Sequence, residues 1–317
     1  MKLLACTLAL AFCVGIAVPE RLASQELTTI RVAMVPNDDV TPFLYAQQTG
    51  MFRDAGLNVQ MQKSTSGAVI AASVAGGSFD VGLASMMALI TAHVRGIPFQ
   101  MIAASGVHVT NAPISQLVVL RDSPIKSAAD LNGKLVSGAA LKDLMTVTTQ
   151  AWMDQHGGNS ETLRFVELPQ PVVPAALEDK RIDAGTLLQP VLADAMATGK
   201  FRSIGSPFDG VGKRFMYAAW FTTADFAAKN PDAVKRFAEV MRKATVYTNA
   251  HPAQTVGIIA AFTGLDPTRI ANMTRALCAE YLDPADIQPT IDAAVRYKVI
   301  DKGFPARELI SQYAPRK

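Results

Sequence analysis

Segments typical of β-strands alternate with segments typical of helices along almost the whole of this chain. Short runs with β-branched residues or alternating polarity cover residues 28–36, 57–64, 79–85 and 98–106. The stretches between them are rich in apolar and small residues and end at or near glycines, as helices often do. From about Ser115 the same order of elements starts again. Because strands joined through a helix usually pair in parallel, the alternation predicts an α/β fold with mainly parallel sheets.

A repeated turn indicates two lobes of related topology. The segments SVAGGSFDVGLAS and ALEDKRIDAGTLLQP each lead from a helix end through a turn to an apolar residue, Asp, a small residue and Gly. Asp80 therefore corresponds to Asp183, and Gly82 to Gly185, at the same offset in the chain. We expect Asp80 to organise its turn rather than to perform chemistry. Two ordinary helix-to-strand turns in a single large sheet are the alternative.

The size of the chain agrees with two lobes. With 317 residues, 50% of them hydrophobic and 18% charged, it can form two globular cores and is not expected to be disordered. We expect residues 25–115 and 216–317 to form the first lobe and residues 116–215 the second. The strand-like run 214–223 would carry the chain back to the first lobe.

The N-terminus has the pattern of an export signal. Lys2 is followed by an apolar run from Leu3 to Val18, shorter than the roughly 20 residues of a membrane-spanning helix and typical of a signal-peptide core. We expect residues 1–24 to be a signal peptide, which implies a periplasmic protein. The alternatives are a buried N-terminal helix and a lipid anchor at Cys13, although the bulky Phe12 precedes that cysteine.

The C-terminal part has helical patterns at 230–252, 266–281 and 283–300. Asn230 is the expected N-cap of the first helix, since Pro follows it. Without the signal peptide Cys278 is the only cysteine, so the core forms without a disulfide. Its place in the second pattern predicts a small, buried helical residue.

Motifs for catalysis are missing. Gly77 and Gly82 have the spacing of a phosphate-binding loop, but Leu83 and Ala84 follow where lysine and a hydroxyl residue are needed. The formal net charge is only +3, with no long basic run to attract nucleic acid. The histidines occur singly, without the spacing of metal ligands, at His93, His108, His156 and His251. We therefore expect no catalytic residue, metal site, cofactor or nucleic-acid partner.

Polar residues are concentrated in loops that follow predicted strands. Open α/β sheets bind small ligands at these carboxyl ends, where helix N-termini also point. Neutral donors and acceptors suit binding better than catalysis, although the same residue types also form turns and caps. Acids beside such a site disfavour a bare anion unless they point away. The candidate ligand-binding residues are Asn37, Asp38, Asp39, Thr41, Ser64, Thr65, Ser66, Ser85, Met86, Gly138, Ala140 and Gln189, with Phe43 and Tyr45 as aromatic walls.

An ordered series of short blocks runs through the mature chain. The blocks are Gly50-Met51-Phe52, Gly56-Leu57-Asn58-Val59, Asp80, Gly82, Gly96-Ile97-Pro98, Asp130-Leu131, Gly133-Lys134, Asp183 and Pro190. In this order they resemble the NMT1/THI5-like (SsuA/TauA-like) family of periplasmic solute-binding proteins.

The resemblance implies a type II periplasmic binding protein fold. Such a protein has two α/β lobes, each a mixed but mainly parallel sheet flanked by helices, with hinge crossovers and a helical C-terminal part. The ligand lies in the cleft between the lobes, and the protein, expected to be a monomer, delivers it to the permease of an ABC importer.

Family ligands include alkyl sulfonates, nitrate-like anions, pyrimidine precursors of thiamine and aromatic acids. Family members commonly have an acid where this chain has Gln189. A ligand with a cationic group at this position is therefore less expected. The candidate loops contain no arginine to clamp an anion, although backbone amides at helix N-termini could hold one. We therefore expect a small heterocycle or aromatic molecule, neutral or carboxylated.

Two other functions stay open. Pyrimidine-precursor synthases resemble the same family, but they carry a cysteine-rich motif and iron-binding histidines and are not exported. TAXI-type receptors, which serve ion-driven transporters, have the same two-lobed shape.

Overall fold

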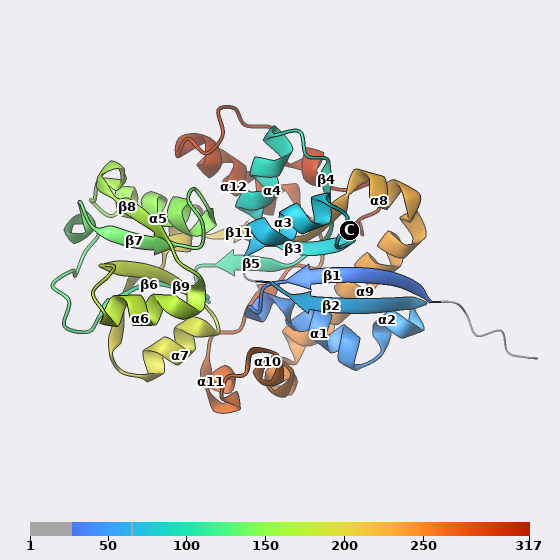
Figure 1. Ribbon diagram of the computed structural model, residues 1–317, viewed down its shortest axis with the longest axis horizontal. Coiled ribbons are helices and arrows are strands. Elements are labelled where there is room, and N and C mark those ends of the chain that lie inside the picture. The colour runs from blue at the N-terminus through green and yellow to red at the C-terminus, as the bar shows by residue number, and fades with distance from the viewer. Residues whose placement is uncertain (1–26, 65) are drawn as a thin grey trace, which may run out of the picture.

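Two five-stranded sheets, each flanked by helices, lie side by side along the long axis of the molecule (Figure 1). The computed structural model describes residues 27–64 and 66–317. The predicted signal peptide, residues 1–24, lies outside the described residues. None of the helices in the described part combines the length and apolar composition needed to cross a membrane.

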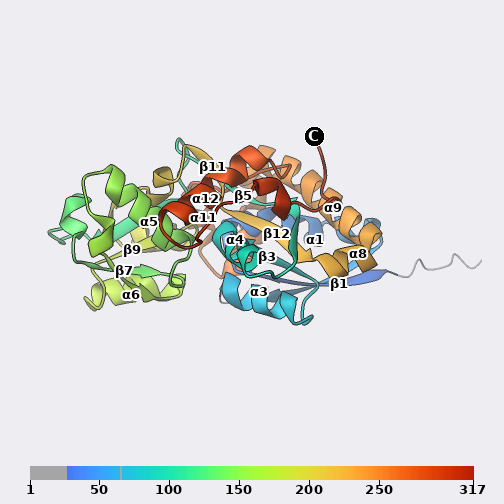
Figure 2. The same ribbon diagram turned by 90° about the horizontal axis from the view of Figure 1, so that it is seen from above.

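The first sheet has the strand order β2-β1-β3-β12-β4. Its strands are β1 (Thr28–Met34), β2 (Leu57–Lys63), β3 (Val81–Ser85), β4 (Phe99–Ala104) and β12 (Ala218–Thr223). β1 pairs in parallel with β2 and β3, whereas β12 runs antiparallel to both of its neighbours. The helices around this sheet are α1 (Thr41–Gln48), α2 (Met51–Asp54), α3 (Gly67–Ala75), α4 (Met86–Val94), α8 (Ala224–Lys229), α9 (Pro231–Ala250), α10 (Val256–Thr263), α11 (Pro267–Asn272) and α12 (Pro284–Arg296). Figure 2 shows α3 on one face of the sheet and α9 on the other.

The second sheet repeats this layout with the order β10-β6-β9-β7-β8. Its strands are β6 (Ser115–Leu120), β7 (Leu135–Gly138), β8 (Arg164–Glu167), β9 (Ala184–Leu188) and β10 (Phe201–Gly205), and its helices are α5 (Leu144–Gln155), α6 (Val173–Glu178) and α7 (Val191–Ala197). β7 is parallel to β8 and β9, and β6 is antiparallel to β9 and β10. Leu117 and Val119 belong to the core on one face and Val118 to that on the other, so the sheet is buried on both sides.

A small third sheet joins the two halves. β5 (Gly106–Val109) pairs with β11 (Arg214–Met216) and with β13 (Leu277–Cys278), both antiparallel. The chain leaves the first sheet through β5 and returns to it through β11. The predicted α/β fold with two lobes and hinge crossovers is therefore confirmed, and a single large sheet is ruled out. Both large sheets are mixed as expected, but antiparallel pairs are as numerous as parallel ones instead of a minority.

Asp80 and Asp183 have the same role in the two sheets. The backbone N–H of Asp80 donates to the carbonyl of Arg31 in β1 at 2.9 Å. The backbone N–H of Arg31 donates in turn to the carboxylate of Asp80 at 2.8 Å. Asp183 makes both bonds with Leu135 in β7, each at 2.8 Å. The prediction that Asp80 organises its turn is confirmed, because its carboxylate joins the start of β3 to β1.

The paired glycines are required by close packing of a helix against each sheet. A Cβ atom at Gly82 would lie 2.5 Å from the side chain of Ile70 and 2.7 Å from that of Phe221. At Gly185 it would lie 2.5 Å from Val173. Real Cβ atoms do not approach so closely. The repeated glycine therefore allows the same close contact between a helix and the sheet in each lobe.

Two details of the C-terminal part differ from the sequence-based expectation. Helix α11 ends at Asn272, and Cys278 lies in β13 rather than in a helix. Its side chain is 4% exposed, so the predicted burial is confirmed. Asn230 does precede α9, but its amide donates to the carbonyl of Phe226 at 3.1 Å and makes no cap bond, because it serves the end of α8 instead.

Candidate functional site

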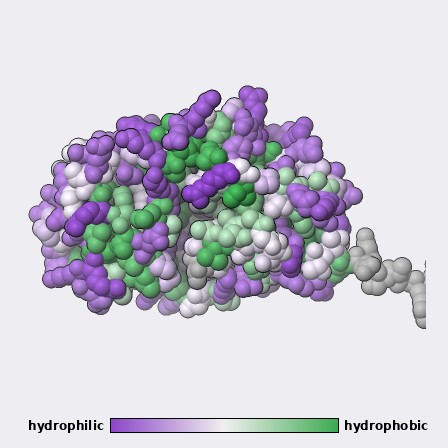
Figure 3. Space-filling model, turned by 45° about the horizontal axis from the view of Figure 1, so that its top comes forward, coloured by the Kyte–Doolittle hydropathy of each residue, from purple (hydrophilic) through white to green (hydrophobic). Residues whose placement is uncertain are grey.

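A cavity of about 640 Å³ lies between the two lobes. Figure 3 shows the face on which they meet, with hydrophobic residues gathered on both sides of the dividing line. Loops that follow strands of both large sheets form the walls of the cavity. From the first lobe these are residues 35–37, 64, 66–67 and 84–85, and from the second residues 139–145 and 169–171.

Two helix N-termini point into the cavity from the first lobe. Ser66 caps α3 by accepting from the N–H of Val69 at 3.4 Å, and Ser85 caps α4 by accepting from the N–H of Ala88 at 3.3 Å. The turns adjoin, since a Cβ at Gly67 would lie 3.7 Å from the backbone nitrogen of Ser85. Helix N-termini carry partial positive charge, so this wall favours an acceptor or anionic group of a ligand.

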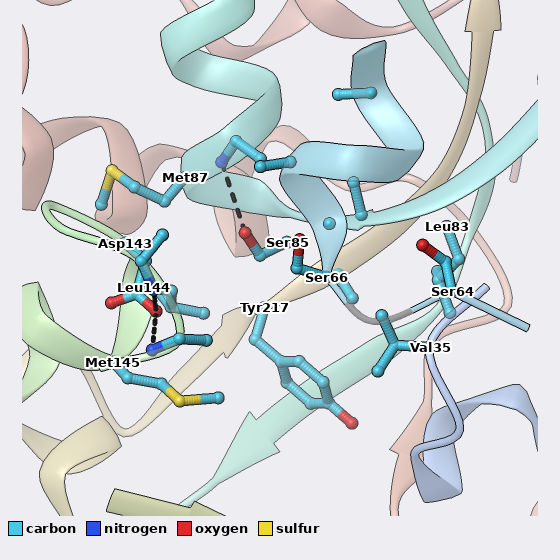
Figure 4. A pocket seen from close by; sticks show the side chains of 18 of the residues that line it. Val35, Ser64, Ser66, Leu83, Ser85, Met87, Asp143, Leu144, Met145 and Tyr217 are labelled. Atoms are coloured by element: carbon cyan, nitrogen blue, oxygen red, sulfur yellow. Dashed lines mark hydrogen bonds between the residues drawn. The ribbon is translucent and has the colours of Figure 1, made fainter. Parts of the chain in front are cut away.

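The opposite wall has its helix donors already occupied. Asp143 caps α5 with a carboxylate that accepts from the N–H groups of Ala139 (2.8 Å), Ala140 (3.1 Å) and Thr146 (2.8 Å). Burial nevertheless raises the pKa of Asp143, and these hydrogen bonds oppose the rise. Figure 4 shows Asp143 with the apolar side chains of Leu144 and Met145 facing the cavity. The second lobe therefore offers mainly apolar contact here.

The floor of the cavity contains a buried acid. Asp39 is 2% exposed and lines the cavity, close to the phenol of Tyr217. Burial, together with the charge of Asp38, raises the pKa of Asp39 to about 7. Burial raises the pKa of Tyr217 well above its usual value, and the charge of Asp39 adds to this.

Six of the predicted site residues line the cavity. They are Asn37, Asp39, Ser64, Ser66, Ser85 and Ala140. Thr65 lies outside the described residues. For all of them, contact with a ligand stays a prediction.

Asp38 and Thr41 are placed in an ion-pair network behind the cavity wall. The carboxylate of Asp38 accepts from Nε of Arg275 at 3.0 and 3.1 Å and from the N–H of Ala276 at 2.6 Å. The hydroxyl of Thr41 donates to the same carboxylate at 3.1 Å. These contacts fasten the loop after β1 to the segment before β13.

Other predicted site residues lie away from the cavity lining. Phe43 is fully buried and stacks on Trp220, with ring centroids 5.2 Å apart. Tyr45 stacks on Tyr247 at 4.5 Å. Met86 is fully buried at the start of α4.

Gly138 and Gln189 support the second lobe's turns. A Cβ at Gly138 would lie 2.4 Å from the side chain of Thr146 in α5. The side-chain oxygen of Gln189 accepts from the N–H of Ala193 at 3.1 Å, within the first turn of α7. Neither residue is part of the cavity lining.

Several lining residues were not predicted from the sequence. Gln170 follows β8, so the rule for loops after strands would have found it. Tyr217 lies between β11 and β12 and has no such signal. Arg95 and Lys142 also line the cavity, so although the predicted loops lack arginine the cavity does not. Among the described residues, no three His, Cys, Asp or Glu side chains are grouped as metal ligands would be.

Comparison with known proteins gives consistent matches. The model of the family described as NMT1/THI5 like matches residues 37–255. The 4-amino-5-hydroxymethyl-2-methylpyrimidine phosphate synthase THI11 of Saccharomyces cerevisiae is 23% identical over 72% of this chain and 70% of its own. A Brucella abortus protein named as a binding protein is 23% identical over 84% of this chain and 80% of its own.

A solved structure has the same fold. The periplasmic aliphatic sulphonate binding protein SsuA of Escherichia coli superposes with a TM-score of 0.71 at 19% identity, over 90% of this chain and 92% of that one. At this identity the likeness shows a shared fold.

Proposed function

This chain belongs to the NMT1/THI5-like family, and from that premise we propose that it is an exported solute-binding protein for an ABC-type importer. The observation that supports this most directly is the cavity of about 640 Å³ lined by both lobes. Ligand pockets of roughly 300–1,000 Å³ hold small organic molecules. In this proposal residues 1–24 direct export to the periplasm, and a permease receives the solute.

The proposal divides the chain into one lobe of residues 25–115 and 216–317 and another of residues 116–215. In the described part of the chain, two strands, β5 and β11, carry the chain between the large sheets, as a hinge requires. Side chains also bridge the lobes: Arg269 pairs with Asp194, the hydroxyl of Tyr297 donates to Asp154 at 3.1 Å, and Nζ of Lys142 donates to the carbonyl of Lys298 at 3.2 Å. Such contacts can break and reform while both sheets stay intact, so the lobes can open for the solute and close on it.

The chemistry of the walls indicates the shape of the solute. Apolar side chains, among them Leu144 and Met145, would hold an apolar body, while the N-termini of α3 and α4 would bind an acceptor group. We propose that Ser66 and Ser85 contact this group, with Asn37, Ser64 and Ala140 also touching the solute. A small heterocycle or aromatic molecule satisfies both walls.

A thermal-shift screen of the mature protein tests the proposal. The panel contains sulfonates, pyrimidines, aromatic acids and amino acids. A solute at 100 times its Kd adds about 2.7 kcal/mol of stability, which raises Tm measurably. If no compound shifts Tm and one is instead turned over, the proposal is wrong.

A matched pair of cap variants locates the site. Ser85→Ala removes the α4 cap at the cavity, and Thr223→Ala removes the α8 cap, which lies elsewhere and accepts from the N–H of Phe226 at 3.1 Å. Each loses about 1 kcal/mol of stability. Only Ser85→Ala weakens the best solute, by about tenfold, because it loses one hydrogen bond. Equal affinity in the two variants would remove Ser85 from the site.

The similarity to the yeast synthase keeps an enzyme as the second candidate function. Incubating the protein with the best-binding pyrimidine distinguishes the two, since a binding protein returns it unchanged. A receptor of an ion-driven transporter would also return it, and reconstitution with an ATP-dependent permease separates that case.

A further inference from the structure

Asp39 is a buried acid with one carboxylate oxygen, Oδ1, for which the described residues provide no hydrogen-bond partner. Its side chain is 2% exposed and lines the floor of the cavity. Within residues 27–64 and 66–317, no donor lies within hydrogen-bonding distance of its Oδ1 atom. The hydroxyl of Ser64, on the same cavity wall, is also buried without a partner. Buried polar atoms are almost always hydrogen-bonded, so these two need an explanation.

The neighbouring acids show how this fold treats a structural carboxylate. Asp38 is equally buried, at 2%, yet it is held by Arg275, Thr41 and the N–H of Ala276. Asp143, on the opposite wall, accepts from three backbone N–H groups. Asp39 differs from both, because one of its carboxylate oxygens has no donor among the described residues while the residue itself lines the cavity.

We propose that the solute carries an N–H donor, such as an ammonium, amidinium or amino-heterocycle group, which hydrogen-bonds to Asp39 at the floor of the cavity. This inference rests on the proposed function and adds the class of solute. Such a donor would satisfy Oδ1 of Asp39. A group that also has a lone pair, as an aminoheterocycle does, could in addition accept a hydrogen bond from the hydroxyl of Ser64.

The groups around Asp39 supply no competing cation. Asp38 precedes it and is paired with Arg275, Tyr217 approaches from the segment between β11 and β12, and Cys278 approaches from β13. The thiol of Cys278 and the hydroxyl of Ser105 donate to the backbone carbonyl of Asp39, at 3.6 and 3.2 Å, and not to its carboxylate. An anion placed here would meet an ionised carboxylate with no positive charge to offset it.

The two ends of the cavity then select different parts of one molecule. The N-termini of α3 and α4, with Ser66 and Ser85, favour an acceptor, and Asp39 favours a donor. Figure 4 shows Ser66 and Ser85 between Asp143 on one side and Ser64 on the other, with Tyr217 below them in this view. The pKa of Asp39, raised to about 7, agrees with this assignment, because a cationic donor would restore the ionised form that burial disfavours.

Calorimetric titration with matched probes tests the inference. Benzylamine, benzamidine and 4-(aminomethyl)benzoate carry the donor, whereas benzoate and benzenesulfonate have a similar body without it. We expect the donor probes to bind wild type at pH 8 and their Kd to rise at least tenfold in Asp39→Asn. Asp225→Asn, a change at an exposed acid away from this cavity, should leave every Kd unchanged.

The pH dependence gives a second readout. Benzylamine stays protonated between pH 6 and pH 8, while the ionised fraction of Asp39 rises with a pKa of about 7. Its affinity for wild type should therefore rise about tenfold over this range, and that for Asp39→Asn should stay flat.

Each outcome decides a separate question. If benzoate or benzenesulfonate binds and the donor probes do not, the inference is wrong and the proposed function stands. Donor binding that is unaffected by Asp39→Asn also overturns the inference. If neither these probes nor the wider panel bind, both the inference and the proposed function fail.

Discussion

Replacing Asp39 by Asn should change how the stability of the ligand-free protein depends on pH. The pKa of Asp39 is raised from 3.8 to about 7, because its carboxyl group is buried and lies beside Asp38. The folded protein therefore holds a proton that the unfolded chain releases between about pH 4 and pH 7. Stability falls as the pH rises through this window and levels off above it.

The magnitude follows from the size of the shift. A difference of about three pKa units at ~1.4 kcal/mol per unit corresponds to roughly 4 kcal/mol. Asn does not ionise and has nearly the same shape. Relative to Asp39→Asn, wild type should therefore lose about 4 kcal/mol of unfolding free energy between pH 4 and pH 8.

Urea unfolding of both proteins across this range measures the effect. Each protein is first unfolded, dialysed and refolded to remove any bound solute. The other titrating groups are common to both chains, so subtracting one stability curve from the other isolates Asp39. A difference that stays constant from pH 4 to pH 8, or that favours wild type at high pH, would refute the reasoning.

The packing of the fold leads to further predictions, each measured by urea unfolding. Gly82→Ala and Gly185→Ala should each cost about 1–3 kcal/mol, because the new methyl group would overlap a helix side chain, whereas Gly257→Ala in α10, with nothing within 4 Å, should be neutral or stabilising. A similar loss at all three glycines would contradict the packing argument. Arg275→Ala should cost about 3–5 kcal/mol, because it leaves Asp38 buried without its counter-ion. A loss below 1 kcal/mol there would show that the ion pair is not structural.

The sequence predicted the fold well because its signals are local. β-Branched runs, glycine stops and the Asp-x-Gly turn describe neighbouring residues, and the predicted runs 28–36, 57–64, 79–85 and 98–106 contain β1, β2, β3 and β4. β10 was not predicted. The equivalence of Asp80 and Asp183 was also visible, since each carboxylate binds the backbone of the adjacent strand. Cys278 was misplaced in a helix because its pairing with β5, about 170 residues earlier in the chain, is not encoded nearby.

The site was less predictable than the fold. Ser66 and Ser85 were found because they lie in loops that follow predicted strands, where open α/β sheets bind ligands. Asp38 and Asp39 are adjacent and chemically identical, yet only one receives the guanidinium of Arg275 from a distant segment. No local pattern separates a paired acid from a free one. Tyr217 was missed for the same reason, because its place in the cavity depends on how the hinge strands bring the lobes together.

Direct titration of the best solute into three proteins tests the central claim, that the cavity between the lobes binds a small molecule. The proteins are wild type, Ala140→Trp, which fills the cavity from the second lobe, and Ala129→Trp, which places the same side chain on an exposed surface outside it. We predict one solute per chain for wild type and for Ala129→Trp, and no binding to Ala140→Trp, whose Tm should match that of Ala129→Trp. Unchanged affinity in Ala140→Trp would contradict the claim, because the solute would then bind elsewhere.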